Sequence, residues 1–445
     1  MKNISIWEDN LKQKKYPVLN KDTSCDVLII GGGITGISSL YHMKDTNLKV
    51  MLVEQNKIGM STTSRSTGKL SYLQNDLIDK IRVSSGDDVA KEYLKSQKEA
   101  ISLINKVISK EKINCDLEKV NSLLYTNKPK EIDTIKDLKD FLESCNIKVN
   151  ETNNIIVKSK YMIETNNTYL IHPVKFVLGL ASKLNNIYEN TTIKKITMDN
   201  ETYLCYTDEH VIKAKYVVIA SHYPYFNCPF IFPTKASLEK SYLCAFNYKY
   251  PKTSLISYSN PFISIRNYLD KLIYLSNSHS INKNTCDKNN FNELLKKVHD
   301  LDGKEEYLWS NIDIITSDGL PYIGEVKDKL IMATGYNTWG LTNGFLAGSI
   351  IRDIILKKNN PYILLFDPKR NNLEKIIGNF TNSFKSISGF INGFINSKNN
   401  YKCTHMGCKL IYNEIENTFD CPCHGSRFDK NGNVIVSPAN KKINK

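Results

Sequence analysis

The sequence predicts an α/β protein in which a parallel-sheet domain of βαβ type is combined with an antiparallel-sheet domain and a small all-β module. Three observations predict this architecture: a glycine-rich turn between a buried strand and a helix near the N-terminus, short alternating strands in the middle, and cysteines and histidines crowded into residues 401–445. A chain of 445 residues is long enough for two or three domains with a sizeable core.

The first element is a βαβ unit that begins at residues 26–30, an apolar run typical of a buried parallel strand. GGGITG follows at once, then a stretch with helical spacing, and then a second strand over residues 48–54. In this G-x-G-x-x-G motif the first glycine permits a tight turn, the second lets the backbone approach a pyrophosphate, and the third lets helix and strand pack closely. The acid that ends the second strand would accept hydrogen bonds from a ribose. The predicted dinucleotide contacts are Gly31, Gly33, Ile34, Thr35, Gly36 and Glu54.

The middle of the chain predicts helices over residues 87–109 and 132–145, then short strands over 192–221 and 241–277. Near residue 318 the pattern returns to that of the first domain, with a strand before Gly335 and a helix that ends at residue 355. This order predicts a discontinuous nucleotide domain with an antiparallel-sheet insert over about residues 150–310.

Over residues 24–356 the chain resembles the D-amino-acid-oxidase-like (DAO) family of FAD-dependent oxidoreductases. The matches are the glycine motif, the loop over residues 61–69, the strand end at 217–221, and DGLPYIG followed by ATGYNTWGLTNG at 318–344. The glycine motif alone does not separate FAD from NAD, but the resemblance implies FAD. It also implies further cofactor contacts, which are Ser61, Thr62, Thr63, Ser66, Gly335, Gly340, Thr342 and Gly344.

The catalytic residues are not assigned by this resemblance. Amino-acid-oxidising members often carry an arginine before Pro-Tyr-Ile-Gly to grip the substrate carboxylate, whereas this chain has Trp-Ser-Asn-Ile-Asp at 309–313. A second arginine common in the late turn is replaced around Trp339. Arg266 is an alternative clamp, although a structural role is as well expected for it. His222, Tyr223 and His172 are candidate bases, and Trp339 is a further catalytic candidate. A lone histidine is more often structural, however, and hydride transfer to flavin need not use a base.

The last segment contains Cys403-Thr-His405-Met-Gly-Cys and Cys421-Pro-Cys-His424. Two loops that each give one Cys and one His supply the two thiolates and two imidazoles of a Rieske [2Fe–2S] cluster. Residues 406–420 between the pairs are enough for a short hairpin. Tetrahedral zinc is the alternative for such ligands, but it leaves the other cysteine of each loop unexplained.

Residues 401–440 resemble the Rieske family, with further matches at Gly407, Pro422, Gly425, Ser426 and a Ser-Pro-Ala turn at 437–439. The resemblance implies the metal ligands Cys403, His405, Cys421 and His424, and a disulfide between Cys408 and Cys423.

Two features depart from that family. Phe428 stands where high-potential members place a tyrosine hydroxyl near a cluster sulfur, which predicts a lower reduction potential. The strands that usually precede the first cluster loop are not visible. A linker over residues 357–400 with an amphipathic helical stripe at 373–395 takes their place. The module over 401–445 is therefore either trimmed or supported by the flavin domain. The helical stripe is expected to pack against the flavin domain, and the alternative is that it lies on a membrane surface.

Composition limits the partners. The net charge is +14, from 60 Lys and Arg against 46 Asp and Glu, but the lysines are scattered singly and in pairs, which predicts a solvated basic surface and no nucleic-acid binding. No apolar run is long enough to span a bilayer, and the N-terminus lacks a signal-peptide core. We therefore expect no stable membrane insertion and a cytoplasmic location.

The two modules together predict a dehydrogenase. A small, amine-type substrate would pass a hydride to the flavin, and electrons would leave singly through the cluster to an outside acceptor such as a ferredoxin or a reductase. One alternative is reverse flow, from a reductase or ferredoxin to a substrate bound at the flavin. The other is a redox sensor or electron carrier without catalysis, for which we expect a pocket plugged by side chains.

Overall fold

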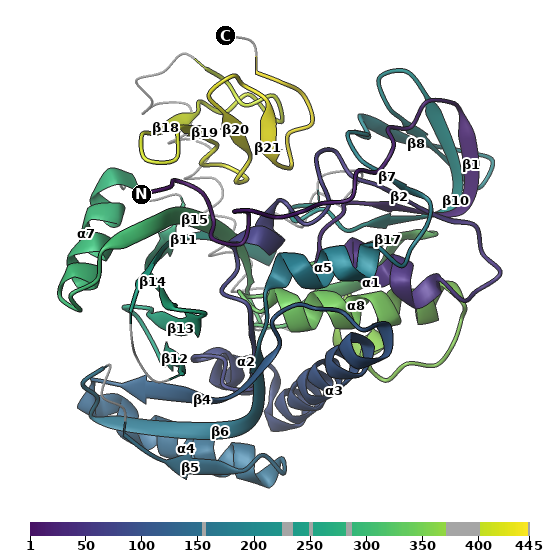
Figure 1. Ribbon diagram of the computed structural model, residues 1–445. Helices are drawn as coiled ribbons and strands as arrows, with labels where there is room; N and C mark the ends of the chain where they lie inside the picture. The colour runs from purple at the N-terminus through teal and green to yellow at the C-terminus, as the bar shows by residue number, and fades with distance from the viewer. Residues whose placement is uncertain (154–156, 225–234, 249–251, 282–286, 371–400, 444–445) are drawn as a thin grey trace.

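The computed structural model describes residues 1–153, 157–224, 235–248, 252–281, 287–370 and 401–443. Two large sheets and a small C-terminal sheet make up this part of the chain (Figure 1). The helical stripe predicted at 373–395 lies outside the described residues.

The first sheet is the nucleotide-binding sheet, and it is mainly parallel. Its strands run in the order β16 (Tyr322–Lys327), β17 (Leu330–Thr334), β10 (Val211–Ile219), β1 (Thr23–Ile30), β2 (Val50–Val53) and β7 (Ile187–Tyr188). The hairpin of β8 (Lys195–Asp199) and β9 (Thr202–Tyr206) pairs with β10, and β16 is antiparallel to β17. All four residues of β2 are buried because the sheet is covered on both faces.

Helices α1 (Ile34–Met43) and α8 (Gly340–Ile355) lie side by side on one face of this sheet, with α5 (Pro173–Ala181) and α3 (Asp87–Glu111) beside them (Figure 1). Their close approach depends on Gly348, where an added Cβ would lie 2.4 Å from Ser38 Oγ. The helices predicted at 87–109 and 132–145 correspond to α3 and α4 (Ile132–Ser144).

The second sheet is mostly antiparallel. Its strands run in the order β15 (Glu305–Thr316), β11 (Ala236–Asn247), β14 (Lys271–Ser280), β13 (Ser264–Tyr268), β12 (Ser254–Ser257), β4 (Glu118–Thr126), β6 (Tyr161–Leu170) and β3 (Lys69–Leu70), and β5 (Val149–Glu151) pairs with β6. The remaining helical segments are η1 (Thr62–Arg65), α2 (Leu77–Ser85), η2 (Pro129–Glu131), α7 (Asp287–His299) and α9 (Tyr362–Leu365).

This sheet differs from the single insert expected at about 150–310. β3 and β4 precede that range yet belong to the second sheet, because both pair with β6. β7 to β10 fall inside the range yet belong to the first sheet, because β7 pairs parallel with β2 and β10 pairs parallel with β1. The chain therefore crosses between the two sheets more than once, which local strand patterns do not reveal.

The C-terminal module is a four-stranded antiparallel sheet of β18 (Ile411–Asn413), β19 (Thr418–Asp420), β20 (Arg427–Asp429) and β21 (Val434–Val436). The hairpin expected between the two cluster loops is β18–β19. In Figure 1 the module, drawn in yellow, lies against the end of the second sheet formed by β11 and β15.

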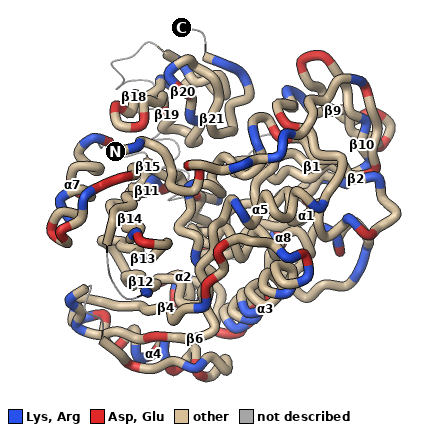
Figure 2. Tube along the Cα trace, in the orientation of Figure 1, with Lys and Arg blue, Asp and Glu red and all other residues tan. Residues whose placement is uncertain are grey.

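Charged residues are distributed along the described parts of the chain in Figure 2, with Asp and Glu interspersed among Lys and Arg. Within the described residues, no helix combines the length and the apolar character needed to cross a bilayer.

Candidate functional site

A pocket opens at the carboxyl ends of β1, β2 and β10 and continues to the second sheet. Of the fourteen predicted cofactor contacts, the structure places eleven on its wall. They are Gly31, Gly33, Ile34, Thr35, Glu54, Ser61, Thr62, Thr63, Ser66, Gly335 and Gly340.

The other three predicted contacts lie behind the wall. A Cβ at Gly36 would lie 1.9 Å from the carbonyl oxygen of Gly31, so this glycine allows helix α1 to pack on β1. A Cβ at Gly344 would lie 2.8 Å from Ile34, between α8 and α1. Thr342 Oγ1 donates to Gln97 Oε1 at 2.7 Å. These three residues shape the helix packing that surrounds the pocket.

The glycine turn fits a pyrophosphate. Gly31 has a φ of +113°, and a Cβ there would lie 2.8 Å from the carbonyl oxygen of Ala220. Gly33, the N-cap of α1, has no side chain, and the N–H of Ile34 donates to Thr63 Oγ1 at 3.2 Å. Gly33, Ile34 and Thr63 all line the pocket, so the positive end of the helix lies at its wall. The Glu54 carboxylate accepts from the main-chain N–H groups of Gly32 at 2.7 Å and Asn56 at 2.8 Å, which fixes it beside the turn. Burial raises the pKa of Glu54.

Two tryptophans that the sequence did not single out hold the loop over residues 61–69. Trp7 Nε1 donates to the carbonyl oxygen of Ser66 at 2.7 Å, and Trp309 Nε1 donates to that of Arg65 at 3.1 Å. Both indoles are fully buried. A tryptophan in a polar N-terminal segment was the one available signal for the first of them, since Trp side chains seldom stay exposed.

Arg266 is not a substrate clamp in this structure. Its Nε donates to the carbonyl oxygen of Asn267, and its Nη1 donates to those of Thr67, Gly68 and Ile171 at 2.8–3.0 Å. The guanidinium is buried over the ring of Trp7 and does not line the pocket. Burial lowers the pKa of Arg266 to about 9. The candidate was wrong because neighbouring backbone carbonyls satisfy the side chain.

The other candidates are divided between the pocket and the core. His222 and Trp339 line the pocket, and among the described residues neither His222 Nε2 nor Trp339 Nε1 has a hydrogen-bond partner. Burial lowers the pKa of His222 to about 4, so its imidazole is neutral near pH 7. His172 instead caps α5, where its Nδ1 accepts from the N–H of Lys175 at 3.2 Å.

Where the pocket meets the second sheet, its wall has an apolar part and an acidic part. Ile256, Phe262 and Leu275 supply apolar side chains. Glu239 of β11 and Asp313 of β15 are direct cross-strand neighbours, and both line the pocket. Burial raises the pKa of Asp313 to about 7. An ammonium group is the natural partner for such a pair of carboxyls.

The predicted cluster ligands come together in the C-terminal module. The thiols of Cys403 and Cys421 are hydrogen-bonded to each other, and the rings of His405 and His424 lie 4.9 Å apart. Burial lowers the pKa of His405 to about 4 and that of His424 to about 3, which keeps both imidazoles neutral, as metal ligands must be. Two thiols and two neutral imidazoles at one place fit a Rieske cluster.

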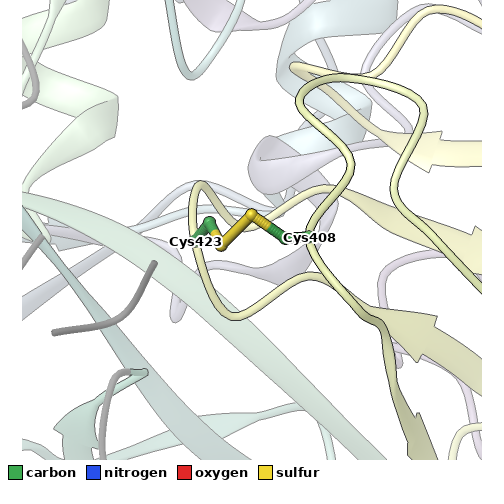
Figure 3. The surroundings of a disulfide bond; sticks show 2 residues. All are labelled: Cys408 and Cys423. Carbon is green, nitrogen blue, oxygen red and sulfur yellow. A yellow bond between two sulfur atoms is a disulfide. The ribbon is translucent and has the colours of Figure 1, made fainter. Parts of the chain in front are cut away.

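Cys408 and Cys423 form the predicted disulfide, which ties the two cluster loops together (Figure 3). The sulfurs of this pair and of Cys421 lie within 4.8 Å of one another. Because the disulfide occupies two of the three, this trio does not supply a zinc site with thiolate ligands. Ser426 Oγ accepts from the N–H of Ala439 at 3.0 Å, which holds the Ser-Pro-Ala turn over the same loops.

The module contacts the pocket directly. Ser437, Pro438 and Asn440 are part of the pocket wall. The ring of Tyr223 lies 5.2 Å from the ring of His424. Since Tyr223 follows His222, which lines the pocket, two consecutive residues connect the pocket to a predicted cluster ligand.

A buried ionic network, defined here as six charged side chains, joins the module to the flavin domain. Glu416 binds Arg65 at 2.9 Å and Arg427 at 2.8 Å, and Asp420 binds Arg427 at 3.0 Å and Lys240 at 2.7 Å. Lys240 also binds Asp287 at 2.9 Å. The three cations and three anions balance, and each side chain is 11% exposed or less. Burial at this depth is tolerated because every charge is paired.

Comparison with known proteins agrees with this site. A family model described as FAD dependent oxidoreductase matches residues 26–354, and the Rieske [2Fe-2S] domain model matches residues 399–445. The chain is 27% identical to "Putative Rieske 2Fe-2S iron-sulfur protein YhfW" of Bacillus subtilis (strain 168), over 99% of this chain and 96% of that protein. It is 24% identical to gamma-glutamylputrescine oxidoreductase of Escherichia coli (strain K12), over 77% of this chain and 86% of that protein.

Among solved structures, glycine oxidase from Geobacillus kaustophilus shares the fold, with a TM-score of 0.65 and 17% identity over 78% of this chain and 99% of that chain. The family models assign FAD to the pocket and a [2Fe–2S] cluster to the module, in place of the zinc alternative. The chain therefore belongs to the FAD dependent oxidoreductase family, as an enzyme of that family with a C-terminal Rieske [2Fe–2S] domain.

Proposed function

We propose that the protein is a cytoplasmic amine dehydrogenase that releases electrons one at a time through its Rieske domain. The observation that carries the proposal is the contact between the two sites: Pro438 of the module lines the FAD pocket, and Tyr223 packs on His424. FAD, when bound, takes a hydride from the substrate, and the cluster takes electrons singly. A one-electron centre placed beside a two-electron site favours a dehydrogenase with a protein acceptor, such as a ferredoxin.

The proposed substrate is a small amine with no need for a carboxylate clamp. The amine carbon would lose a hydride and the nitrogen would end as an imine, which water hydrolyses. Glu239 and Asp313 place two carboxyl groups on the pocket wall that can accept hydrogen bonds from an ammonium group, and Arg266 is committed to backbone carbonyls. The wall therefore favours an amine over a carboxylate. Gamma-glutamylputrescine oxidoreductase, one of the relatives, is named for an amine.

The same residues would orient the substrate and keep water out. Ile256, Phe262 and Leu275 supply an apolar surface for the hydrocarbon part of an amine. Trp7 and Trp309 fix the loop that covers the flavin, because each indole donates to a main-chain carbonyl of that loop. The pocket continues from the cofactor-binding residues to the apolar and acidic side chains of the second sheet, which supports catalysis over a sensor or carrier role.

The test is anaerobic mixing of the holoenzyme with glycine or gamma-glutamylputrescine, with flavin absorbance and cluster EPR followed together. We expect one of the amines to bleach the flavin and the cluster signal to follow. Flavin bleaching without any change at the cluster would contradict the electron route. If instead a reduced ferredoxin or reductase bleaches the flavin and no amine does, the flow runs in the reverse direction.

A further inference from the structure

Lys69 is a buried lysine on the pocket wall that the proposed chemistry has not yet used. It begins β3, directly after the loop that covers the flavin, and its side chain is 5% exposed. Long cationic side chains are almost never buried this deeply without a carboxylate partner. Lys69 therefore needs an explanation.

The surroundings of Lys69 favour a neutral amine. Its Nζ donates to the carbonyl oxygen of Leu255 at 2.7 Å and to Ser264 Oγ at 2.8 Å. Within the described part of the chain no carboxylate lies within ion-pairing distance of Nζ, and the charge that acts on it is the buried cation Arg266. Burial, with a smaller effect of Arg266, lowers the pKa of Lys69 well below its usual value.

The hydrogen bonds fit that state. A neutral amine has two hydrogens and one lone pair, and the two bonds to Leu255 and Ser264 use two hydrogens. The lone pair is then not used by either bond, and Lys69 lines the pocket together with Ser264, Ile256 and Phe262. A charged ammonium in this position would instead carry a third hydrogen with no anionic partner.

We propose that Lys69 is the base that takes the proton from the ammonium group of the substrate before hydride transfer. The inference rests on the proposed amine dehydrogenase function and deepens it. An amine in solution near pH 7 is mostly an ammonium ion, which has no lone pair to expel a hydride from the adjacent carbon. Lys69 Nζ accepts one proton, the substrate becomes a free amine, and its nitrogen lone pair forms the C=N bond as the hydride leaves. The product leaves as a positively charged iminium ion, and Lys69 then releases its proton to solvent.

Two experiments test this assignment. The first uses holoenzyme labelled with [ε-13C]lysine, in which the Lys69 signal is identified by its loss in Lys69→Met. We expect the shift of a neutral lysine at pH 7.5 without substrate. A signal that titrates near the normal lysine pKa would overturn the proposal.

The second experiment measures anaerobic flavin reduction by gamma-glutamylputrescine between pH 6 and 10. Loss of a general base lowers a rate by roughly 100-fold or more, so Lys69→Met is expected to lose about 100-fold at pH 7. Its rate should then recover tenfold per pH unit as solvent deprotonates the amine. Lys297→Met is the matched control, because Lys297 is also partly buried with a lowered pKa but lies outside the pocket.

Lys69→Arg separates the role of a base from that of a hydrogen-bond donor, because arginine donates hydrogen bonds but stays protonated and cannot accept a proton. The assignment of Lys69 as the base would be refuted by either of two results. One is a wild-type pH profile in Lys69→Arg, and the other is a pH profile of Lys69→Met that runs parallel to that of wild type. If both variants fail to fold, Ser264→Ala leaves Lys69 in place but removes a hydrogen-bond acceptor from its Nζ, which lowers the Lys69 pKa further and is expected to lower the pH at which reduction reaches its plateau. If neither gamma-glutamylputrescine nor glycine reduces the wild-type flavin, the proposed amine dehydrogenase function is contradicted. If they reduce it and the profiles stay parallel, the assignment of Lys69 alone fails.

Discussion

Glu416 is a side chain of the Rieske module that pairs with Arg65 of the flavin domain and with Arg427 of the module itself, and replacing it by glutamine tests whether the ionic network docks the module. Burial alone would raise the pKa of Glu416, but Arg427, Arg65 and Lys240 together lower it to about 2 from an ordinary 4.5. That difference corresponds to about 3 kcal/mol in favour of the charged side chain. Loss of one partner from a buried ion pair costs a similar amount, about 3–5 kcal/mol.

Glu416→Gln keeps the shape and removes the charge, so the network is left with three cations and two anions. We expect the free energy of local opening to fall by about 3 kcal/mol, which is roughly 100-fold in the opening equilibrium. Hydrogen–deuterium exchange of the holoenzyme measures this directly in peptides that cover β19 and β20. Exchange in β1 and β2 should not change, because these strands lie in the other sheet.

Glu414→Gln is the matched control. Glu414 lies two residues away and pairs with Lys288 at 3.4 Å, but both side chains are more than half exposed. Exposed pairs contribute about 0–1 kcal/mol, so this variant is expected to exchange like wild type. Equal exchange in the two variants would refute the view that the network holds the module in place.

Four further predictions concern the two cofactor sites. Phe428→Tyr is expected to raise the midpoint potential of the cluster in voltammetry by adding a hydrogen bond, and an unchanged midpoint would contradict that explanation. The double variant Cys408→Ser, Cys423→Ser opens a loop of 15 residues and should cost about 3 kcal/mol, seen as a lower urea midpoint for loss of cluster absorbance. Gly36→Ala places a Cβ 1.9 Å from a carbonyl oxygen and should abolish FAD retention on gel filtration. Between the lowered pKa of Lys69 in the folded protein and its ordinary pKa of 10.5, the side chain binds fewer protons in the folded state than in the unfolded state. The free energy of unfolding should therefore rise with pH across that window, and it should rise more in wild type than in Lys69→Met.

The sequence was most informative where a short segment carries the chemistry. The glycine turn and the two cluster loops could be predicted because their ligands lie a few residues apart, and the structure gathers Cys403, His405, Cys421 and His424 at one place. The disulfide of Cys408 and Cys423 is confirmed. Local spacing determines such sites almost completely, whatever the rest of the chain does.

The features that were missed depend on contacts between distant segments. Trp7 reaches Ser66 across 59 residues, and Lys69 reaches Ser264 across 195. Arg266 was chosen as a clamp because nothing local reveals that three carbonyls from two other segments satisfy it. The sheet insert was placed over 150–310 for a related reason, since strand patterns do not state which sheet a strand joins.

The Rieske module is best understood together with the surface that it covers. Its apolar cluster among the described residues is small: four of the nine buried residues in the cluster are cysteines, and the side chains as large as leucine are Leu410, Phe419, Phe428 and Ile443. A segment of about 40 residues rarely buries enough apolar surface to fold alone and needs a disulfide, a metal or a partner surface. This module has all three, because β11 and β15 supply Lys240 and the Ser310 carbonyl that its polar side chains bind. The flavin domain thus supplies part of the support that the module needs, and the same docking that stabilises the module holds His424 against Tyr223.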